Sequence, residues 1–262
     1  MQMRSLARKV AKAAVMPLAI PDRRRLGDVV ILCYHRVGVG DREIDLPLSP
    51  FRQHLGLLAS RERVLSLDDA LAARRGGVVL TIDDGFRDFH DHVVPLLLQY
   101  RLPALLYLAT GPVADGHRSP SLPDALTWSM LRDAVGTGLV TIGAHTHNHV
   151  DLSRLPEGEA EEEMRRSKET IEDRLGMPCR HFAYPWGRGS AGADRAARQL
   201  FETAALVAWK TNRRAGLDRH RLGRTPILRS DGRVFFRVKL LGLLDSEALV
   251  YRVLRRGPWG RT

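Results

Sequence analysis

The stretch LTIDDGFRD (residues 80–88) ends an apolar run with two adjacent carboxylates, Asp83 and Asp84. The run itself, GVVLTID (77–83), has the composition of a buried β-strand. Aspartate is depleted in strands, and a buried carboxylate needs a partner. Because neighbouring side chains of a strand point to opposite faces, we expect the two aspartates to diverge and to have different tasks. Capping a helix that starts near Phe86 is the alternative role for such a pair.

Short apolar runs of this kind alternate along the chain with longer helical patterns. The strand candidates are residues 29–35, 77–83, 104–110, 140–146, 180–185, 204–209 and 224–228, and the helix candidates are 49–60, 86–101, 127–138, 156–176 and 192–202. Six or seven strand–helix repeats predict an α/β fold with helices covering parallel strands, and this number favours a closed or nearly closed barrel. Such barrels carry their sites at the carboxyl ends of the strands. The polar residues at those ends are His35, Asp83, Asp84, His145 and Tyr184 to Gly187.

A cluster of histidines follows one strand candidate, in GAHTHNHVDL (143–152). If the chain turns helically at Thr146, His145 and His149 share one face and can bind one ion through nitrogens at ~2.0–2.1 Å. If it stays extended, His147 shares that face as well. The loop-forming residues of NHVDLSRLP favour the turn. Two histidines and a carboxylate form a ligand set that leaves positions open for water and substrate, so one aspartate could complete it and the other could act as a base.

The charge distribution narrows the class of protein. The net charge of +11 is carried by the ends: residues 1–28 hold seven Lys/Arg and two Asp, residues 210–262 hold fourteen Lys/Arg and four Asp/Glu, and the remainder is negative by four. A nucleic-acid enzyme would carry its basic surface around its site, so this pattern argues against one. It suits ends that lie on an anionic surface such as a membrane, although a high-GC genome, which favours arginine codons, would give the same counts.

Three motifs occur along the chain in the order TIDDG (81–85), HTHNH (145–149) and FAYPWG (182–187). Together they resemble the polysaccharide deacetylases, the carbohydrate esterases of family 4 that contain the NodB homology domain. The similarity extends from about Ile31 to Leu228. The resemblance implies a distorted (β/α) barrel with about seven parallel strands. It also implies removal of N- or O-acetyl groups from sugars with one divalent metal ion, most often Zn²⁺.

The resemblance also implies a role for each matching residue. It makes Asp83 the general base, and it makes the metal ligands Asp84, His145 and His149. It places along the substrate groove Tyr184, Pro185, Trp186 and Gly187. Trp186 could stack on a sugar ring, and a backbone N–H near it could hold the developing oxyanion. Ordinary core packing is the alternative for this tryptophan.

Two departures from the family pattern concern proton transfer. Many members have an arginine that orients the base two residues before the proline of the third motif, where this chain has Ala183. The family's late motif supplies a histidine as general acid, and RTPILRSDGRVFFRVKLLGLL contains none. His35 ends the first strand candidate and should face the same rim as Asp83, whereas His181 begins its strand and should lie at the far end. We expect His35 to act as general acid or to orient Asp83, with simple hydrogen bonding as the alternative.

We divide the chain into a basic N-terminal extension (1–28), a NodB-like catalytic domain (29–232) and a basic amphipathic helical extension (233–262). The N-terminus begins like a signal peptide, but its apolar part is short, is broken by Pro17 and is followed by charge, so we expect a basic amphipathic helix. No stretch approaches the ~20 apolar residues of a transmembrane helix, and we expect a cytoplasmic or peripheral membrane protein. The C-terminal extension either docks on the barrel or lies on an anionic membrane. Cys33 and Cys179 sit in strand regions and are expected to be unpaired core residues.

The sequence therefore predicts a metal-dependent hydrolase that removes N-acetyl groups from an amino-sugar polysaccharide or its precursor. In this mechanism Asp83 is the base and a metal-bound water is the nucleophile. The expected partner is an acetylated amino-sugar polymer or oligosaccharide, and no nucleic acid. Two alternatives stay open: a catalytically silent carbohydrate-binding domain that keeps the groove, and a deacylase of a small non-sugar amide.

Overall fold

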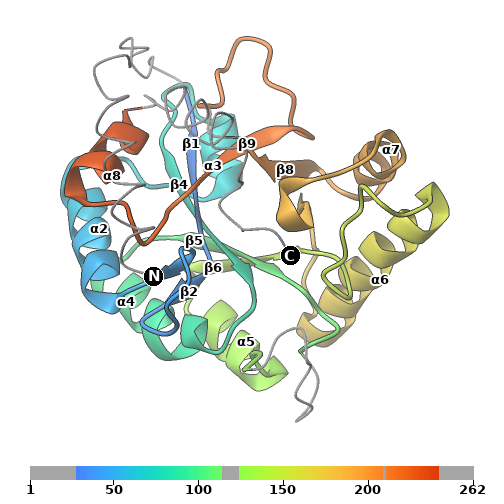
Figure 1. Ribbon diagram of the computed structural model, residues 1–262, viewed down its shortest axis with the longest axis horizontal. Coiled ribbons are helices and arrows are strands. Elements are labelled where there is room, and N and C mark those ends of the chain that lie inside the picture. The colour runs from blue at the N-terminus through green and yellow to red at the C-terminus, as the bar shows by residue number, and fades with distance from the viewer. Residues whose placement is uncertain (1–27, 114–123, 209–210, 242–262) are drawn as a thin grey trace.

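Seven parallel strands form a closed barrel in the computed structural model, which describes residues 28–113, 124–208 and 211–241 (Figure 1). Each strand pairs with the next, and β9 closes the barrel against β1. This arrangement confirms the predicted α/β barrel. The barrel strands are β1 (Val30–Tyr34), β4 (Val78–Asp84), β5 (Ala104–Leu108), β6 (Val140–Ala144), β7 (His181–Ala183), β8 (Thr203–Val207) and β9 (Leu222–Pro226).

Helices surround the barrel, with α2, α4 and α8 on one side of the view and α6 and α7 on the other (Figure 1). The helices are α2 (Leu48–Arg61), α3 (Leu67–Ala72), α4 (Val94–Tyr100), α5 (Trp128–Gly136), α6 (Glu157–Leu175), α7 (Ala191–Leu200) and α8 (Arg233–Leu240), with single turns η2 (Phe89–Val93) and η3 (Pro185–Gly187). A short pair, β2 (Arg36–Val37) and β3 (Asp45–Leu46), lies outside the barrel sheet.

Local sequence explains where several helices begin and end. Thr127 and Ser190 cap α5 and α7 by accepting hydrogen bonds from backbone N–H groups in the first turn. Gly176 ends α6 with a φ of 66°, as expected of a glycine that precedes a proline by two residues. The helix predicted over residues 86–101 is confirmed from Phe89 to Tyr100, with a π-helical first part, η2, that continues directly into α4. Helix α3 was not predicted. It is capped by Ser66, whose Oγ accepts from the N–H of Asp69.

The strands alternate between two cores. Residues such as Val30, Leu32 and Ile82 face outward and pack under the helices. Residues of the other parity, such as Ile31, Val79, Leu105 and Leu222, fill the barrel interior together with Leu67 and Leu71 of α3. Helix α3 thus closes the amino-terminal end of the barrel, and the polar residues occupy the carboxyl end.

The first part of the C-terminal extension packs on the barrel. Phe236 of α8 stacks on His54 of α2, with ring centroids 3.7 Å apart and planes 5° apart. Lys239, which is 1% exposed, donates to the Pro226 carbonyl at 2.7 Å and to Asp231 Oδ2 at 2.6 Å. Helix α8 therefore belongs to the same core as the barrel, which favours docking for residues 233–241.

Several predictions about the ends concern residues that the structure does not describe. The predicted N-terminal helix, within residues 1–27, and residues 242–262 lie outside the described ranges, so contact of the basic termini with an anionic membrane stays a prediction. Among residues 28–113, 124–208 and 211–241, no helix is both long and apolar enough to cross a membrane. The two cysteines are buried and unpaired, as predicted.

Candidate active site

The two aspartates that end β4 converge on one point at the carboxyl end of the barrel. Asp84 has a φ of 77° and Gly85 a φ of 94°, so the strand breaks sharply at Asp84. The Nε2 of His145 lies 3.9 Å from Asp83 Oδ2 and 3.5 Å from Asp84 Oδ1. The expectation that the two carboxylates diverge was therefore wrong, because the left-handed backbone turns Asp84 back toward its neighbour. A side chain at position 85 would be strained by the φ of 94°, and its Cβ would lie 2.5 Å from Leu108 Cδ1, so Leu108 would have to shift.

Three side chains at this point form a donor set suited to a divalent metal ion. Asp84 Oδ1 lies 3.1 Å from His149 Nε2 and 3.5 Å from His145 Nε2, and the ligand atoms all lie within 4.8 Å of one another. Nitrogen and oxygen ligands at about 2.0–2.1 Å from a tetrahedral zinc ion are about 3.3 Å apart. The two distances from Asp84 to the imidazoles are close to this value, so the residues fit such an ion. His149 is the most accessible of the three, with 18% of its side chain exposed.

The loop after β6 orients the two imidazoles. His145 Nδ1 lies 2.7 Å from the carbonyl of Ala183, so this nitrogen carries the proton and leaves the lone pair of Nε2 directed at Asp84. Thr146 and His149 have positive φ values of 64° and 55°, and the predicted helical turn is a bend instead. The bend still brings the His145 and His149 rings within 5.1 Å. His147 points away, with Nδ1 2.9 Å from Thr110 Oγ1.

Asp83 is held by an arginine that sequence reasoning missed. Arg224 of β9 is fully buried, and its Nη1 and Nη2 donate to Asp83 Oδ1 at 2.5 Å and Oδ2 at 2.8 Å. Its guanidinium also lies 4.9 Å from the centroid of the Tyr107 ring. Burial raises the pKa of Asp83, whereas Arg224 and then the nearby histidines lower it, and the net shift is downward. The signal for this role was an arginine at the start of the apolar run RTPIL, where a buried charge requires a partner.

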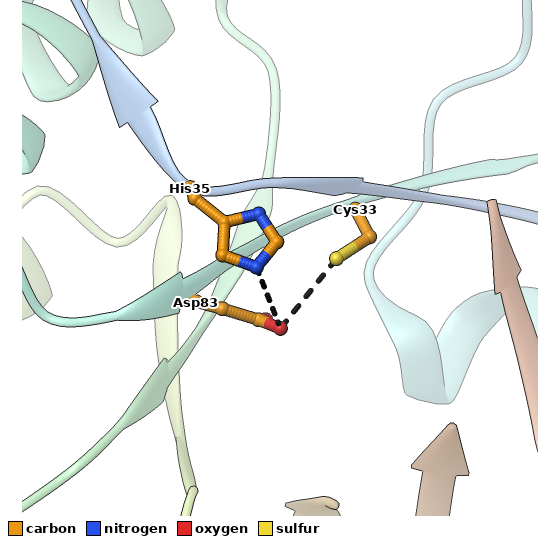
Figure 2. A group of neighbouring side chains, drawn as sticks. All are labelled: Cys33, His35 and Asp83. Carbon is orange, nitrogen blue, oxygen red and sulfur yellow. Dashed lines mark hydrogen bonds and ion pairs between the residues drawn. The ribbon is translucent and has the colours of Figure 1, made fainter. Parts of the chain in front are cut away.

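His35 and Cys33 flank the other side of Asp83 (Figure 2). Tyr34 pairs with Ile82 across β1 and β4, so His35, directly after β1, and Asp83 of β4 reach the same level. His35 Nε2 lies 3.8 Å from Asp83 Oδ2, and Cys33 Sγ donates to the same oxygen at 3.5 Å. Burial lowers the pKa of His35, an effect that Asp84 and Asp83 oppose.

The loop that follows His35 is fastened to the segment after β4. Asp88 accepts a hydrogen bond from the N–H of Val37 at 2.6 Å and a second from Arg36 Nε at 3.4 Å. His181, by contrast, lies at the opposite end of the barrel, as predicted. Its Nε2 is 3.6 Å from Asp68 of α3.

The third motif places one aromatic ring beside the histidines. Trp186 has a φ of 59°, is 36% exposed, and its ring centroid lies 5.3 Å from that of His149. This exposure argues against core packing for Trp186. Tyr184 and Pro185 are buried beneath it, and the Tyr184 hydroxyl donates to Asp194 Oδ1 at 2.9 Å. Of the four groove residues that the resemblance implied, only Trp186 and Gly187 have accessible surface.

A family model described as "polysaccharide deacetylase" matches residues 71–204, just over half of the chain. The chain belongs to the polysaccharide deacetylase family. The matched segment contains both aspartates and the metal-site histidines, whereas His35 and Arg224 lie outside it. The resemblance of the three motifs to this family is thereby confirmed.

Individual proteins similar to this chain agree with the family assignment. YxkH of Bacillus subtilis (strain 168), named as a polysaccharide deacetylase, is 24% identical over 177 residues, which cover 64% of this chain and 60% of that protein. This chain thus spans about three fifths of the length of that curated relative. The structure of IcaB from Ammonifex degensii is 27% identical, with a TM-score of 0.70 over 80% of this chain and 94% of that one. A de-N-acetylase from Aggregatibacter actinomycetemcomitans, 22% identical, has the same fold with a TM-score of 0.70 over 81% of this chain and all of the other.

Proposed function

We propose that this protein is a metal-dependent deacetylase that hydrolyses N-acetyl groups of an amino-sugar polysaccharide or its precursor. The observation that carries the proposal is that the candidate metal site lies next to the candidate base, Asp83. A three-residue donor set for one divalent ion adjoins the carboxylate of Asp83, whose Oδ2 is 3.9 Å from the ligand nitrogen of His145. Membership of the polysaccharide deacetylase family supports the substrate class.

The ion would be held by Asp84, His145 and His149. Two imidazoles and one carboxylate suit Zn²⁺, and three protein ligands leave room for water and substrate. When bound, such an ion polarises the acetyl carbonyl and lowers the pKa of a water molecule in its coordination sphere. Proton transfer and substrate binding are assigned to the residues around the site.

Asp83 is the residue that we assign as the base. Arg224 holds both of its oxygens, which fixes the plane of the carboxylate and keeps it ionised inside the barrel. Asp83 Oδ2 is the oxygen that lies near both His35 and His145. Among the contacts of the described residues, Oδ1 is contacted only by Arg224. We therefore assign proton removal from the attacking water to Oδ2.

His35 is the residue that we assign to the leaving group. Amide hydrolysis requires a proton on the departing nitrogen, and a histidine within reach of the base can supply it. Its Nε2 lies 3.8 Å from Asp83 Oδ2. The alternative role for His35 was to orient Asp83 in place of the arginine that is absent at position 183. Arg224 already fills that role. This favours the acid role.

Trp186 and its backbone are assigned to the substrate. The exposed indole lies beside His149 and presents an aromatic face of the kind on which sugar rings stack. The N–H groups of Gly187 and Arg188 donate to the carbonyls of Tyr184 and Pro185. We assign the N–H of Trp186 itself to the developing oxyanion.

The presence of Arg224 beside Asp83 weakens the case for a catalytically silent domain. That alternative rested on a missing arginine and a missing acid, and both positions have a candidate within 4 Å of Asp83. A deacylase of a small non-sugar amide would use the same chemistry, so only substrate preference separates it from the proposal.

Acetate release tests the proposal directly. The protein should release acetate from chitooligosaccharides, poly-N-acetylglucosamine or peptidoglycan, should lose this activity with a chelator and should regain it with Zn²⁺. His149→Ala should abolish the activity, whereas His147→Ala, whose side chain points away from the donor set, should retain most of it. Acetate release from simple N-acetyl amides alone would favour the non-sugar deacylase, and no release from any substrate would favour the silent domain.

A further inference from the structure

A second group of metal-binding side chains lies beside the first and shares none of its residues. Cys33, His35 and Asp83 surround a common point, and their ligand atoms all lie within 4.8 Å of one another (Figure 2). All three side chains are buried, with exposed fractions of 0%, 7% and 2%. Cys33 lies on β1 and Asp83 on β4, two strands paired in register, and His35 directly follows β1, so the backbone holds the group together.

The distances within this group are close to those of a zinc site. In a tetrahedral zinc site, sulfur at about 2.3 Å and oxygen at about 2.0 Å from the ion lie about 3.5 Å apart, and nitrogen and oxygen about 3.3 Å apart. The Sγ of Cys33 lies 3.5 Å from Asp83 Oδ2, and His35 Nε2 lies 3.8 Å from the same oxygen. The sulfur–oxygen distance is therefore already that of a zinc site, and the nitrogen–oxygen distance is longer by about 0.5 Å.

We propose that Cys33, His35 and Asp83 form a second metal site, selective for thiophilic divalent ions such as Cd²⁺ or excess Zn²⁺, whose occupation blocks hydrolysis. Thiolate and imidazole ligands select soft and borderline ions over Mg²⁺ or Ca²⁺. The blocking half rests on the proposed function, since the ion would occupy the carboxylate assigned as base and the imidazole assigned as acid. The binding half is independent of it.

The charges around the group make this a weaker site than the first. Binding requires Cys33 to lose its proton, which passes to solvent, while His35 binds as neutral imidazole. The guanidinium of Arg224 lies against both oxygens of Asp83 and opposes a second cation there. The Asp84 site has no arginine on its carboxylate among the contacts of the described residues. Metal should therefore fill the Asp84 site first and the cysteine site only in excess.

Cadmium titration of the full chain tests binding without any substrate. After one equivalent of Zn²⁺, added Cd²⁺ should produce a thiolate-to-metal charge-transfer band in the ultraviolet and release protons. The chain has two cysteines, so Cys33→Ser should remove the band while Cys179→Ser, at the other buried cysteine, should keep it. No band in the wild-type protein, or a band that survives Cys33→Ser and disappears with Cys179→Ser, would overturn the proposal. If a variant fails to fold, the wild-type protein still decides whether a thiolate–metal band forms at all.

Inhibition tests the second half. With each variant normalised to its own rate at one equivalent of Zn²⁺, Cys33→Ser should tolerate at least tenfold more Cd²⁺ or excess Zn²⁺ than the Cys179→Ser control. Equal sensitivity of both variants, despite a Cys33-dependent band, would overturn inhibition through this site. A protein that shows the band but no deacetylation at all would contradict the proposed function and leave the second metal site standing.

Discussion

Arg224 on β9 donates from both terminal nitrogens to the carboxylate of Asp83 on β4, across the interior of the barrel, at 2.5 and 2.8 Å. The last strand of the barrel thus supplies the partner of the aspartate that ends the second. A buried ion pair adds little net stability after desolvation of both charges, although breaking it is strongly destabilising. We infer that the pair is kept because it fixes the carboxylate in one orientation.

Breaking this pair should destabilise the fold. Arg224→Met should lower the free energy of unfolding by roughly 3–5 kcal/mol, because it leaves the buried Asp83 carboxylate without its counter-charge. Adding Asp83→Asn to Arg224→Met should recover part of that loss, since the buried charge is then gone. Denaturant unfolding of the metal-free proteins measures both. Arg221→Met is the matched control, because Arg221 is half exposed and pairs with Asp194 at the surface. Simple additivity of the two core substitutions would show that the pair does not act as a unit.

The two aspartates should fail in different ways. Asp83→Asn should keep nearly all of its metal but lose activity by ~10²–10⁴-fold, the usual contribution of general base catalysis. Asp84→Asn should lose metal, because Asp84 Oδ1 is the oxygen 3.1 Å from His149 Nε2. Metal analysis of the purified proteins, together with acetate release, distinguishes the two. Equal metal loss in both variants would contradict this division of labour.

The sequence predicted the seven barrel strands because each is a short apolar run bounded by turn residues. It predicted the histidines at 145 and 149 from their spacing, although the turn between them has left-handed residues and is not helical. It could not predict that Asp83 and Asp84 converge, because this depends on the positive φ of Asp84. Arg224 was missed because its partner lies 141 positions away, and only barrel closure brings the two together.

The stacking of α8 on α2 should make stability depend on pH through His54. Burial lowers the pKa of His54 to about 4, with Asp231 opposing and Lys239 supporting the shift. The imidazole is therefore neutral in the folded protein, whereas it titrates near 6.5 when unfolded. Its contribution is present above pH ~6.5 and is lost as the pH falls toward 4, by up to about 3 kcal/mol.

His54→Gln removes this titration while keeping a polar group near the Tyr34 hydroxyl, which lies 3.4 Å from His54 Nδ1. The difference in unfolding free energy between wild type and variant should shrink or reverse between pH 6.5 and 4. Urea unfolding at several pH values measures it. A difference that stays constant over this range would mean that His54 does not titrate on unfolding.

His35 should matter more for amides than for esters. His35→Ala should keep its metal, because the imidazole is not in the Asp84 donor set. It should lose activity on N-acetyl substrates by about 10²–10³-fold, since an amine leaving group requires a proton from an acid. Activated acetyl esters have leaving groups that depart without one, so the loss on these substrates should be much smaller. His90→Ala is the matched control, because His90 is a partly exposed histidine that pairs with Asp91. Equal losses on amides and esters would instead assign His35 to positioning Asp83, whose Oδ2 lies 3.8 Å from His35 Nε2.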